Sequence, residues 1–253
     1  MPEEGRLLVV NCPPPWRKLP DPFTSKDLGS GHVHAWYSTL EALGEKLGSL
    51  TKLLDAQEHA RADRFRFTSD RARFILGHGL LRIVLGRYLD HSPGSLVLRR
   101  GEFGKPFLDG HPIHFNLSDT KDAVLVALAR QPIGADIETL DRRTDHEGVA
   151  EHYFTSREVK SIADAVDGKR RFLELWTRKE AVLKASGVGI MDDLHSLEVG
   201  EAHNTMTIMH PDFIRLAAPE YHVQTMHVGA DHLVSVASAT PITEITLFEG
   251  LPA

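Results

Sequence analysis

The sequence predicts an α+β fold made of two similar halves that meet near residue 131. Apolar residues recur at helical spacing in two long segments, Phe74–Tyr88 and Arg170–Ser186. Several short runs with the alternation of β-strands follow each segment, which indicates the same order of elements twice. We therefore divide the chain into an N-terminal arm (1–31), an N-terminal α/β half (32–131) and a C-terminal α/β half (132–253).

In the N-terminal half, the arm is rich in proline and glycine, and His32–Ser38 then alternates as a strand does. Leu50–Phe65 has the apolar spacing of a helix, and Thr68 or Ser69 can cap the longer helix that follows. The strands expected next are Leu96–Leu98, His114–Leu117 and Ala123–Ala129.

In the C-terminal half, Thr155 and Glu158 have the spacing of a capping box, in which each side chain binds a free amide at a helix start. The long helix Arg170–Ser186 is expected to end at Gly187. The strands expected here are Ile133–Glu138, Ser196–Val199, Thr205–His210, Tyr221–Val228 and Leu233–Ala239.

Composition narrows the class of protein. The formal charge of −6 is opposite in sign to the broad basic surface of a nucleic-acid-binding protein. Cys12 is the only cysteine, so no intrachain disulfide can form, which suits a reducing compartment. No apolar run approaches the roughly 18 residues that a membrane-spanning helix needs. We expect a cytoplasmic protein that binds neither nucleic acid nor membrane.

Two carboxylates share one side of the strand Ile133–Glu138, because Asp136 and Glu138 are two residues apart. Ala135 and Ile137 then point into apolar packing. Such a pair repels unless a cation lies between the two groups, and Mg²⁺ prefers oxygen ligands. A solvated edge strand is the alternative explanation.

Trp176, Glu180 and Lys184 lie on one face of the second long helix, four residues apart. Glu180 and Lys184 form either a surface ion pair or part of a site. Upstream, a Gly-Lys-Pro turn at Lys105 and Pro106 precedes the segment Phe115-Asn116-Leu117-Ser118-Asp119-Thr120, whose polar groups suit either phosphate binding or a plain hairpin.

Taken in order, these motifs resemble the signature of the 4'-phosphopantetheinyl transferase superfamily, in its long Sfp type. The motifs are Lys-Pro, Phe-Asn-Leu-Ser, Gly-x-Asp-x-Glu and Trp-x-x-Lys-Glu-x-x-x-Lys, and they run from Gly104 to Lys184. The resemblance implies two pseudo-symmetric halves with the active site at their interface. It also implies transfer of phosphopantetheine from coenzyme A to a serine of an apo carrier protein, which releases 3',5'-ADP.

The resemblance also implies roles for individual residues. Glu180 is expected to be the base, and Lys184 to hold the pyrophosphate and assist the leaving group. Asp136, Glu138 and Glu180 are expected to bind Mg²⁺, with Mn²⁺ as the alternative ion. The residues expected to contact coenzyme A are Arg61 (with Arg64 as its rival), Arg73, Lys105, Pro106, Ser118, Asp119 and Lys184.

Asp119 departs from the family pattern, which has histidine at this position. An acid facing a phosphate is repulsive, so we expect Asp119 either to point at a basic residue or to join the metal ligands. This departure is the one feature that favours a weak or inactive homologue, which would only bind carrier protein or coenzyme A. A metal-dependent nuclease is a second rival, but nucleases of that kind usually place the acid and lysine on a strand. The resemblance further implies a monomer, since one chain supplies both halves of the cleft.

Overall fold

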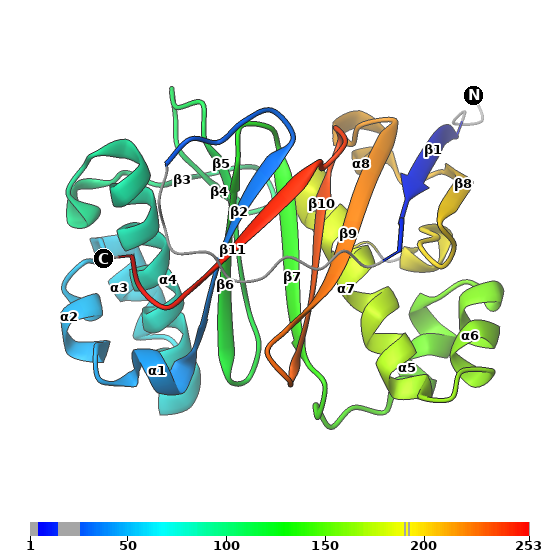
Figure 1. Cartoon of the computed structure of the whole chain (residues 1–253), viewed down its shortest axis with the longest axis horizontal. Coiled ribbons are helices and arrows are strands. Elements are labelled where there is room, and N and C mark those ends of the chain that lie inside the picture. The colour runs from blue at the N-terminus through cyan, green and yellow to red at the C-terminus, as the bar shows by residue number, and fades with distance from the viewer. Residues whose placement is uncertain (1–4, 15–25, 190, 192, 253) are drawn as a thin grey trace.

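The computed structural model describes residues 5–14, 26–189, 191 and 193–252. Its core is a pair of sheets between two layers of helices (Figure 1). The N-half sheet has the strand order β11-β2-β6-β5, and the C-half sheet has the order β7-β10-β9-β1-β8. The predicted mixture of helices and antiparallel strands is confirmed.

The N-half sheet is formed by β2 (His32–Thr39), β5 (His114–Asp119), β6 (Ala123–Ala129) and β11 (Glu244–Glu249). One face of this sheet packs on the long helix α4 (Thr68–Leu89). The remaining elements of this half are α1 (Leu40–Gly44), α2 (Leu47–Thr51), α3 (Ala56–Ala62), a 3₁₀ turn at Pro93–Ser95, β3 (Arg99–Arg100) and β4 (Pro106–Phe107).

The C-half sheet is formed by β1 (Arg6–Asn11), β7 (Ile133–Thr139), β8 (His203–Ile208), β9 (Glu220–Val228) and β10 (His232–Ser238). The helix α7 (Gly168–Ser186) covers its outer face. The remaining elements are α5 (His146–Tyr153), α6 (Ser156–Ala163), a 3₁₀ turn at Leu194–Ser196 and α8 (Pro211–Leu216).

The first and last strands each pair with the other half of the chain. β1 lies within the C-half sheet, antiparallel to β8 and parallel to β9. β11 pairs in parallel with β2 in the N-half sheet. Part of the segment assigned to the N-terminal arm is therefore a strand of the C-half sheet.

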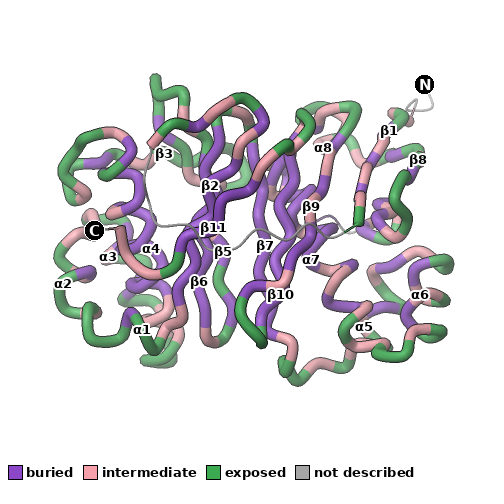
Figure 2. The backbone as a smooth tube through the Cα atoms, in the orientation of Figure 1, coloured by how far each residue is buried: buried purple, intermediate pink, exposed green. Residues whose placement is uncertain are grey.

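A third apolar core fills the space between the two sheets. It contains Val33 and Leu125 from the N-half sheet, and Ala135, Ile137 and Val236 from the C-half sheet. Figure 2 shows the strands on both sides of this layer as buried. This packing holds β7 beside β5, at the boundary between the halves.

Four local predictions differ from the structure. The segment expected as one helix is split, because Asp55 and Glu58 form a capping box that starts a separate helix, α3. Neither Thr68 nor Ser69 caps α4, whose N-cap is Phe67 with no side-chain hydrogen bond. The expected strands Leu96–Leu98 and Ser196–Val199 are absent from the described residues, for reasons taken up in the Discussion.

Candidate active site

Polar side chains of β5 join the two halves where the acidic residues lie. Asn116 Oδ1 accepts a hydrogen bond from the amide of Ala135 at 2.8 Å, and Ser118 Oγ accepts one from the amide of Ile137 at 3.3 Å. Ser118 Oγ also donates to Asp136 Oδ1 at 2.9 Å. The Phe-Asn-Leu-Ser segment, which the sequence associated with phosphate, thus also connects β5 to β7.

The helix α7 lies directly against β7 at Gly134. A Cβ atom at Gly134 would come within 2.1 Å of the carbonyl oxygen of Ala181 and 2.2 Å of the amide nitrogen of Ala185. Only glycine permits this approach. It holds the helix face that carries Glu180 and Lys184 over the acidic side of β7.

Lys184 reaches from this helix to Asp136. Its ammonium donates to Asp136 Oδ1 at 2.6 Å and to Ser118 Oγ at 3.0 Å. Burial lowers the pKa of Lys184, but the carboxylates of Asp136 and Glu180 outweigh burial, so the pKa is raised overall and the group is a cation at neutral pH. Lys184 and Asp136 therefore meet where α7 contacts β7.

Burial and mutual repulsion disfavour three negative charges on Asp136, Glu138 and Glu180. Burial raises the pKa of Glu138 to about 7, and the neighbouring Asp136 adds to the effect. Burial and Asp136 likewise raise the pKa of Glu180. Glu138 is paired with Arg142, which lies four residues further along the chain in the turn after β7. Arg142 was not predicted from the sequence, because its contact with Glu138 depends on how the chain turns after β7.

Two oxygens of this group have no partner. Asp136 Oδ2 and Glu180 Oε1 are buried and accept no hydrogen bond from the described residues. No group of three histidine, cysteine or acidic side chains in the described part of the chain is arranged to hold a metal ion. The unpartnered oxygens and the raised pKa values nevertheless fit a hard cation, because such a cation would satisfy the oxygens and offset the repulsion.

A cavity of about 210 Å³ lies between α4, β5 and the β3–β4 segment, and the charge of Asp119 in its wall helps to raise the pKa of Lys184. It is lined by three arginines, namely Arg61, Arg73 and Arg100, together with Phe74, Gly77, His78, Gly104, Pro106, Leu117 and Asp119. The guanidinium of Arg61 lies 5.2 Å from the centre of the Phe74 ring. Three arginines around one cavity form an anion-binding environment. Arg61 and Arg73 were predicted from the sequence, whereas Arg100 and His78 were not. Arg64 does not line this cavity.

Asp119 is paired with a cation in this cavity. Its Oδ2 lies 2.8 Å from Arg73 Nε, and Arg73 Nη2 lies 3.1 Å from Asp70 Oδ1. The first of the two alternatives considered for Asp119, contact with a basic residue, is the one observed.

Lys105 does not line the cavity in the described structure. Its ammonium donates to the carbonyl oxygens of Ile133 at 2.8 Å and Lys184 at 2.5 Å. Its donors are directed at backbone groups of the C-terminal half. The expectation that this side chain contacts coenzyme A phosphates stays a prediction.

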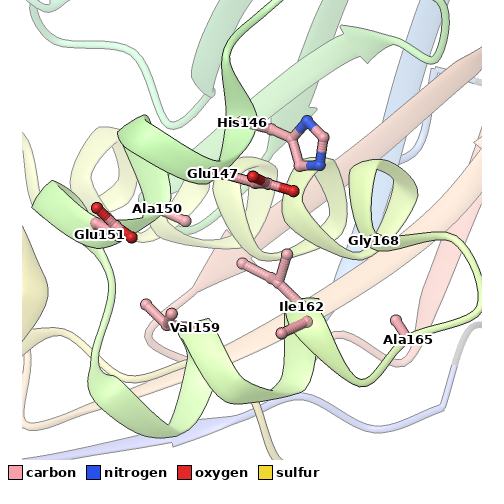
Figure 3. A pocket seen from close by; sticks show the side chains of 9 residues that line it. His146, Glu147, Ala150, Glu151, Val159, Ile162, Ala165 and Gly168 are labelled. Atoms are coloured by element: carbon pink, nitrogen blue, oxygen red, sulfur yellow. The ribbon is translucent and has the colours of Figure 1, made fainter.

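A larger cavity, of about 510 Å³, lies between α5, α6 and the start of α7 (Figure 3). Its wall combines His146, Glu147 and Glu151 with the apolar side chains of Val159 and Ile162. It contains none of the residues expected to act in transfer.

No helix in the described ranges is long and apolar enough to cross a lipid bilayer.

Each half of the chain matches a family model of known proteins. A model described as "4'-phosphopantetheinyl transferase, N-terminal" matches residues 38–131, and one described as "4'-phosphopantetheinyl transferase superfamily" matches residues 132–237. The two matches together include every residue expected at the site.

Several curated relatives carry the same description. The 4'-phosphopantetheinyl transferase HetI of Nostoc sp. is 38% identical over 180 residues, which cover 68% of this chain and 75% of the relative. The 4'-phosphopantetheinyl transferase gsp of Aneurinibacillus migulanus is 32% identical over 149 residues, 58% of this chain and 61% of that protein. Sfp of Bacillus subtilis is 26% identical over 196 residues, 74% of this chain and 83% of Sfp. The chain belongs to the 4'-phosphopantetheinyl transferase superfamily, in its Sfp type.

Proposed function

We propose that the protein transfers 4'-phosphopantetheine from coenzyme A to a serine of an apo carrier protein and releases 3',5'-ADP. The observation that carries the proposal is the group of Asp136, Glu180 and Lys184 at the β7–α7 contact, next to a cavity lined by three arginines. Relatives named as 4'-phosphopantetheinyl transferases support the same reaction.

Asp136, Glu138 and Glu180 are the residues that would hold Mg²⁺, or Mn²⁺ as the alternative. Their oxygens suit a hard cation, and two of them have no partner among the described residues. When bound, the ion would neutralise charge on the pyrophosphate of coenzyme A and polarise the phosphorus that is attacked.

Glu180 is proposed as the base. The serine hydroxyl forms a new bond from its oxygen to the phosphorus next to pantetheine, the bond from that phosphorus to the 3',5'-ADP oxygen breaks, and the serine proton passes to the carboxylate. A positioned base contributes about 10²–10⁴-fold to such a step. The raised pKa of Glu180, caused by burial and by Asp136, makes it a stronger base than a solvated carboxylate.

Lys184 is proposed to stabilise the departing phosphate oxygen. In the structure its ammonium lies between Asp136 and Ser118, one helical turn beyond Glu180. Phosphoryl transfer depends mainly on positioning and on neutralising phosphate charge, so a fixed cation is useful at this place.

The arginine-lined cavity is proposed to hold the nucleotide phosphates of coenzyme A. Arg61 and Arg73 supply positive charge, and Pro106 and Asp119 line the wall. Ser118, which the resemblance placed among the coenzyme A contacts, does not line this cavity and donates to Asp136. Arg100 belongs to this group by position, although its Nη1 also donates to the carbonyl of Gly104 at 2.9 Å. We propose that the chain acts as a monomer, because all of these residues come from one chain. Its single cysteine supports action in the reducing cytoplasm.

The test is intact-mass spectrometry of apo carrier proteins incubated with the protein, coenzyme A and Mg²⁺. A gain of about 340 Da, the mass of the arm that this phosphoryl transfer delivers, is expected with Mg²⁺ and not with EDTA. No gain across several carriers, with coenzyme A bound tightly, would support the inactive homologue instead, which the Asp119–Arg73 pair favours. No gain in mass and no binding of coenzyme A would contradict both the proposed transferase and the inactive homologue.

A further inference from the structure

Lys105 connects the two halves of the chain through backbone groups alone. It belongs to the N-terminal half, between β3 and β4, yet its ammonium contacts the first residue of β7 and the last full turn of α7. Among the described residues no carboxylate forms an ion pair with it. Burial lowers the pKa of Lys105 to about 8, so it is still mainly protonated at pH 7.

The last four carbonyl groups of a helix have no partner within the helix, and the carbonyl of Lys184 is one of these in α7. α7 ends at Ser186, and Gly187, at φ 81°, caps it by donating to the carbonyl of Leu183. The next carbonyl, that of Lys184, accepts from Lys105. A cation at this place also interacts favourably with the negative end of the helix dipole.

Lys184 therefore makes two contacts: its backbone carbonyl accepts from Lys105, and its own ammonium lies in the site. The Lys184 side chain reaches Asp136 and Ser118, while the Lys105 ammonium holds the Lys184 carbonyl and the carbonyl of Ile133, three residues before Asp136. Both ends of the Lys184–Asp136 contact are thus held by one group from the other half.

We propose that Lys105 is a positioning residue that acts through Lys184, and that it does not bind phosphate itself. The inference rests on the proposed function, because it concerns the geometry of the transfer step. It predicts that the loss of Lys105 lowers turnover and leaves the affinity for coenzyme A nearly unchanged.

A double-mutant cycle tests this proposal with Lys105→Met, Lys184→Met and the double variant. In the mass assay, Lys105→Met should lower kcat by about tenfold or more, since small displacements of a catalytic group are costly. Its Kd for coenzyme A, measured by calorimetry, should stay within about threefold. In the Lys184→Met background, Lys105→Met should cost less than about twofold, because residues that act as one unit are not additive.

A matched control is Lys46→Met, which removes an exposed lysine of the N-terminal half and should leave kcat unchanged. If Lys105→Met does not fold, Lys105→Gln keeps a hydrogen-bond donor and should show the same pattern with a smaller loss. Additive losses in the cycle would overturn the proposal. A Kd raised about tenfold with a weaker salt dependence would overturn it too, since that is the behaviour of a phosphate contact.

Hydrogen exchange separates a failure of this inference from a failure of the proposed function. Amides of the last turn of α7 should exchange faster in Lys105→Met than in Lys46→Met, whether or not any carrier is modified. If the wild type proves inactive and the exchange is faster, the function fails and the contact stands. Unchanged exchange would contradict the inference in either case.

Discussion

At Asp136, one carboxylate oxygen receives two donors and the other receives none. Oδ1 accepts from Lys184 and Ser118, whereas Oδ2 is buried without a partner in the described structure. Spacing placed Asp136 with Glu138 on one face of a strand, and Glu180 with Lys184 on one face of a helix. Only the resemblance to the family predicted that Asp136, Glu180 and Lys184 act at one site. The sequence could not predict Arg142 beside Glu138, because that contact depends on how the chain turns after β7.

Glu138 should destabilise the metal-free protein at alkaline pH. Its pKa is raised from 4.5 to about 7 in the folded state, first by burial, so the folded state keeps the proton that the unfolded state loses. Stability therefore falls as pH rises from about 4.5 to about 7. In EDTA at pH 8, Glu138→Gln should melt roughly 3 °C or more above the wild type, since one pKa unit is about 1.4 kcal/mol and a chain of this size gains about 2–4 °C per kcal/mol.

The control for this prediction is the same pair of proteins at pH 4.5, where both side chains are neutral and the difference in Tm should vanish. Equal melting temperatures at pH 8 would show that Arg142 compensates the carboxylate fully.

Asp119→Asn should bind coenzyme A more tightly. The substitution removes a negative charge from a cavity lined by arginines, and Arg73 keeps its contact with Asp70. We expect Kd to fall several-fold at low salt and less at high salt, because exposed charges are screened. Calorimetry at two salt concentrations measures this, with Asp141→Asn, an exposed acid paired with Lys121, as the control. Weaker binding would mean that Asp119 serves chiefly to orient Arg73.

At the scale of elements, the contact between β7 and α7 decides the geometry of the site. Asp136 and Glu138 share a side of β7 with Gly134, and Ala135 and Ile137 pack between the sheets, as the alternation predicted. The capping box at Thr155 and the end of α7 at Gly187 were also predicted correctly, because both depend on local chemistry.

Two predicted strands are absent because buried cations use their backbone groups. The carbonyl of Leu96 accepts from Arg82 Nη1 at 3.0 Å, so this segment has a side-chain partner in place of a neighbouring strand. The carbonyls of Leu194 and Leu197 accept from the ammonium of Lys179. The carbonyl of Val199 accepts from Arg178. Local sequence shows apolar runs at these places but not the distant side chains that satisfy their backbone.

Gly134→Ala should separate α7 from β7. The added methyl group would overlap backbone atoms of α7 at distances near 2 Å, and backbone cannot move away as a flexible side chain can. We expect a loss of at least about 2 kcal/mol of stability, typical of overpacking in a core, and a large loss of turnover. Gly48→Ala is the control, since a methyl group there meets nothing within 4 Å. Thermal melting that is unchanged in Gly134→Ala would contradict the close approach.

At the scale of the whole molecule, the two halves are joined by the exchange of their terminal strands. β1 inserts between β8 and β9 of the C-half sheet, and β11 extends the N-half sheet. Division into two similar halves could be predicted from repeated element order, but this exchange could not, because strand pairing over 200 residues leaves no local pattern. The consequence is that both halves depend on both ends of the chain.

Val10→Asp should destabilise the protein strongly, although it lies in the segment first assigned to an arm. Val10 is fully buried in the core under α7, whereas Leu7, on the same strand, is 60% exposed. An unpaired carboxylate in an apolar core costs several kcal/mol. Denaturant unfolding should show a large loss for Val10→Asp and almost none for Leu7→Asp. Equal stability of the two variants would mean that β1 contributes little to the fold.

The central claim is that the acids and the lysine at the β7–α7 contact carry out the transfer. The most direct measurement is the single-turnover rate of apo carrier protein modification by Glu180→Gln, with Glu147→Gln in the larger cavity as a matched control. The account predicts that Glu180→Gln folds normally, binds coenzyme A and is slowed by about 10²-fold or more, the contribution of a general base, while the control keeps the wild-type rate. Near-wild-type transfer by Glu180→Gln would contradict the account.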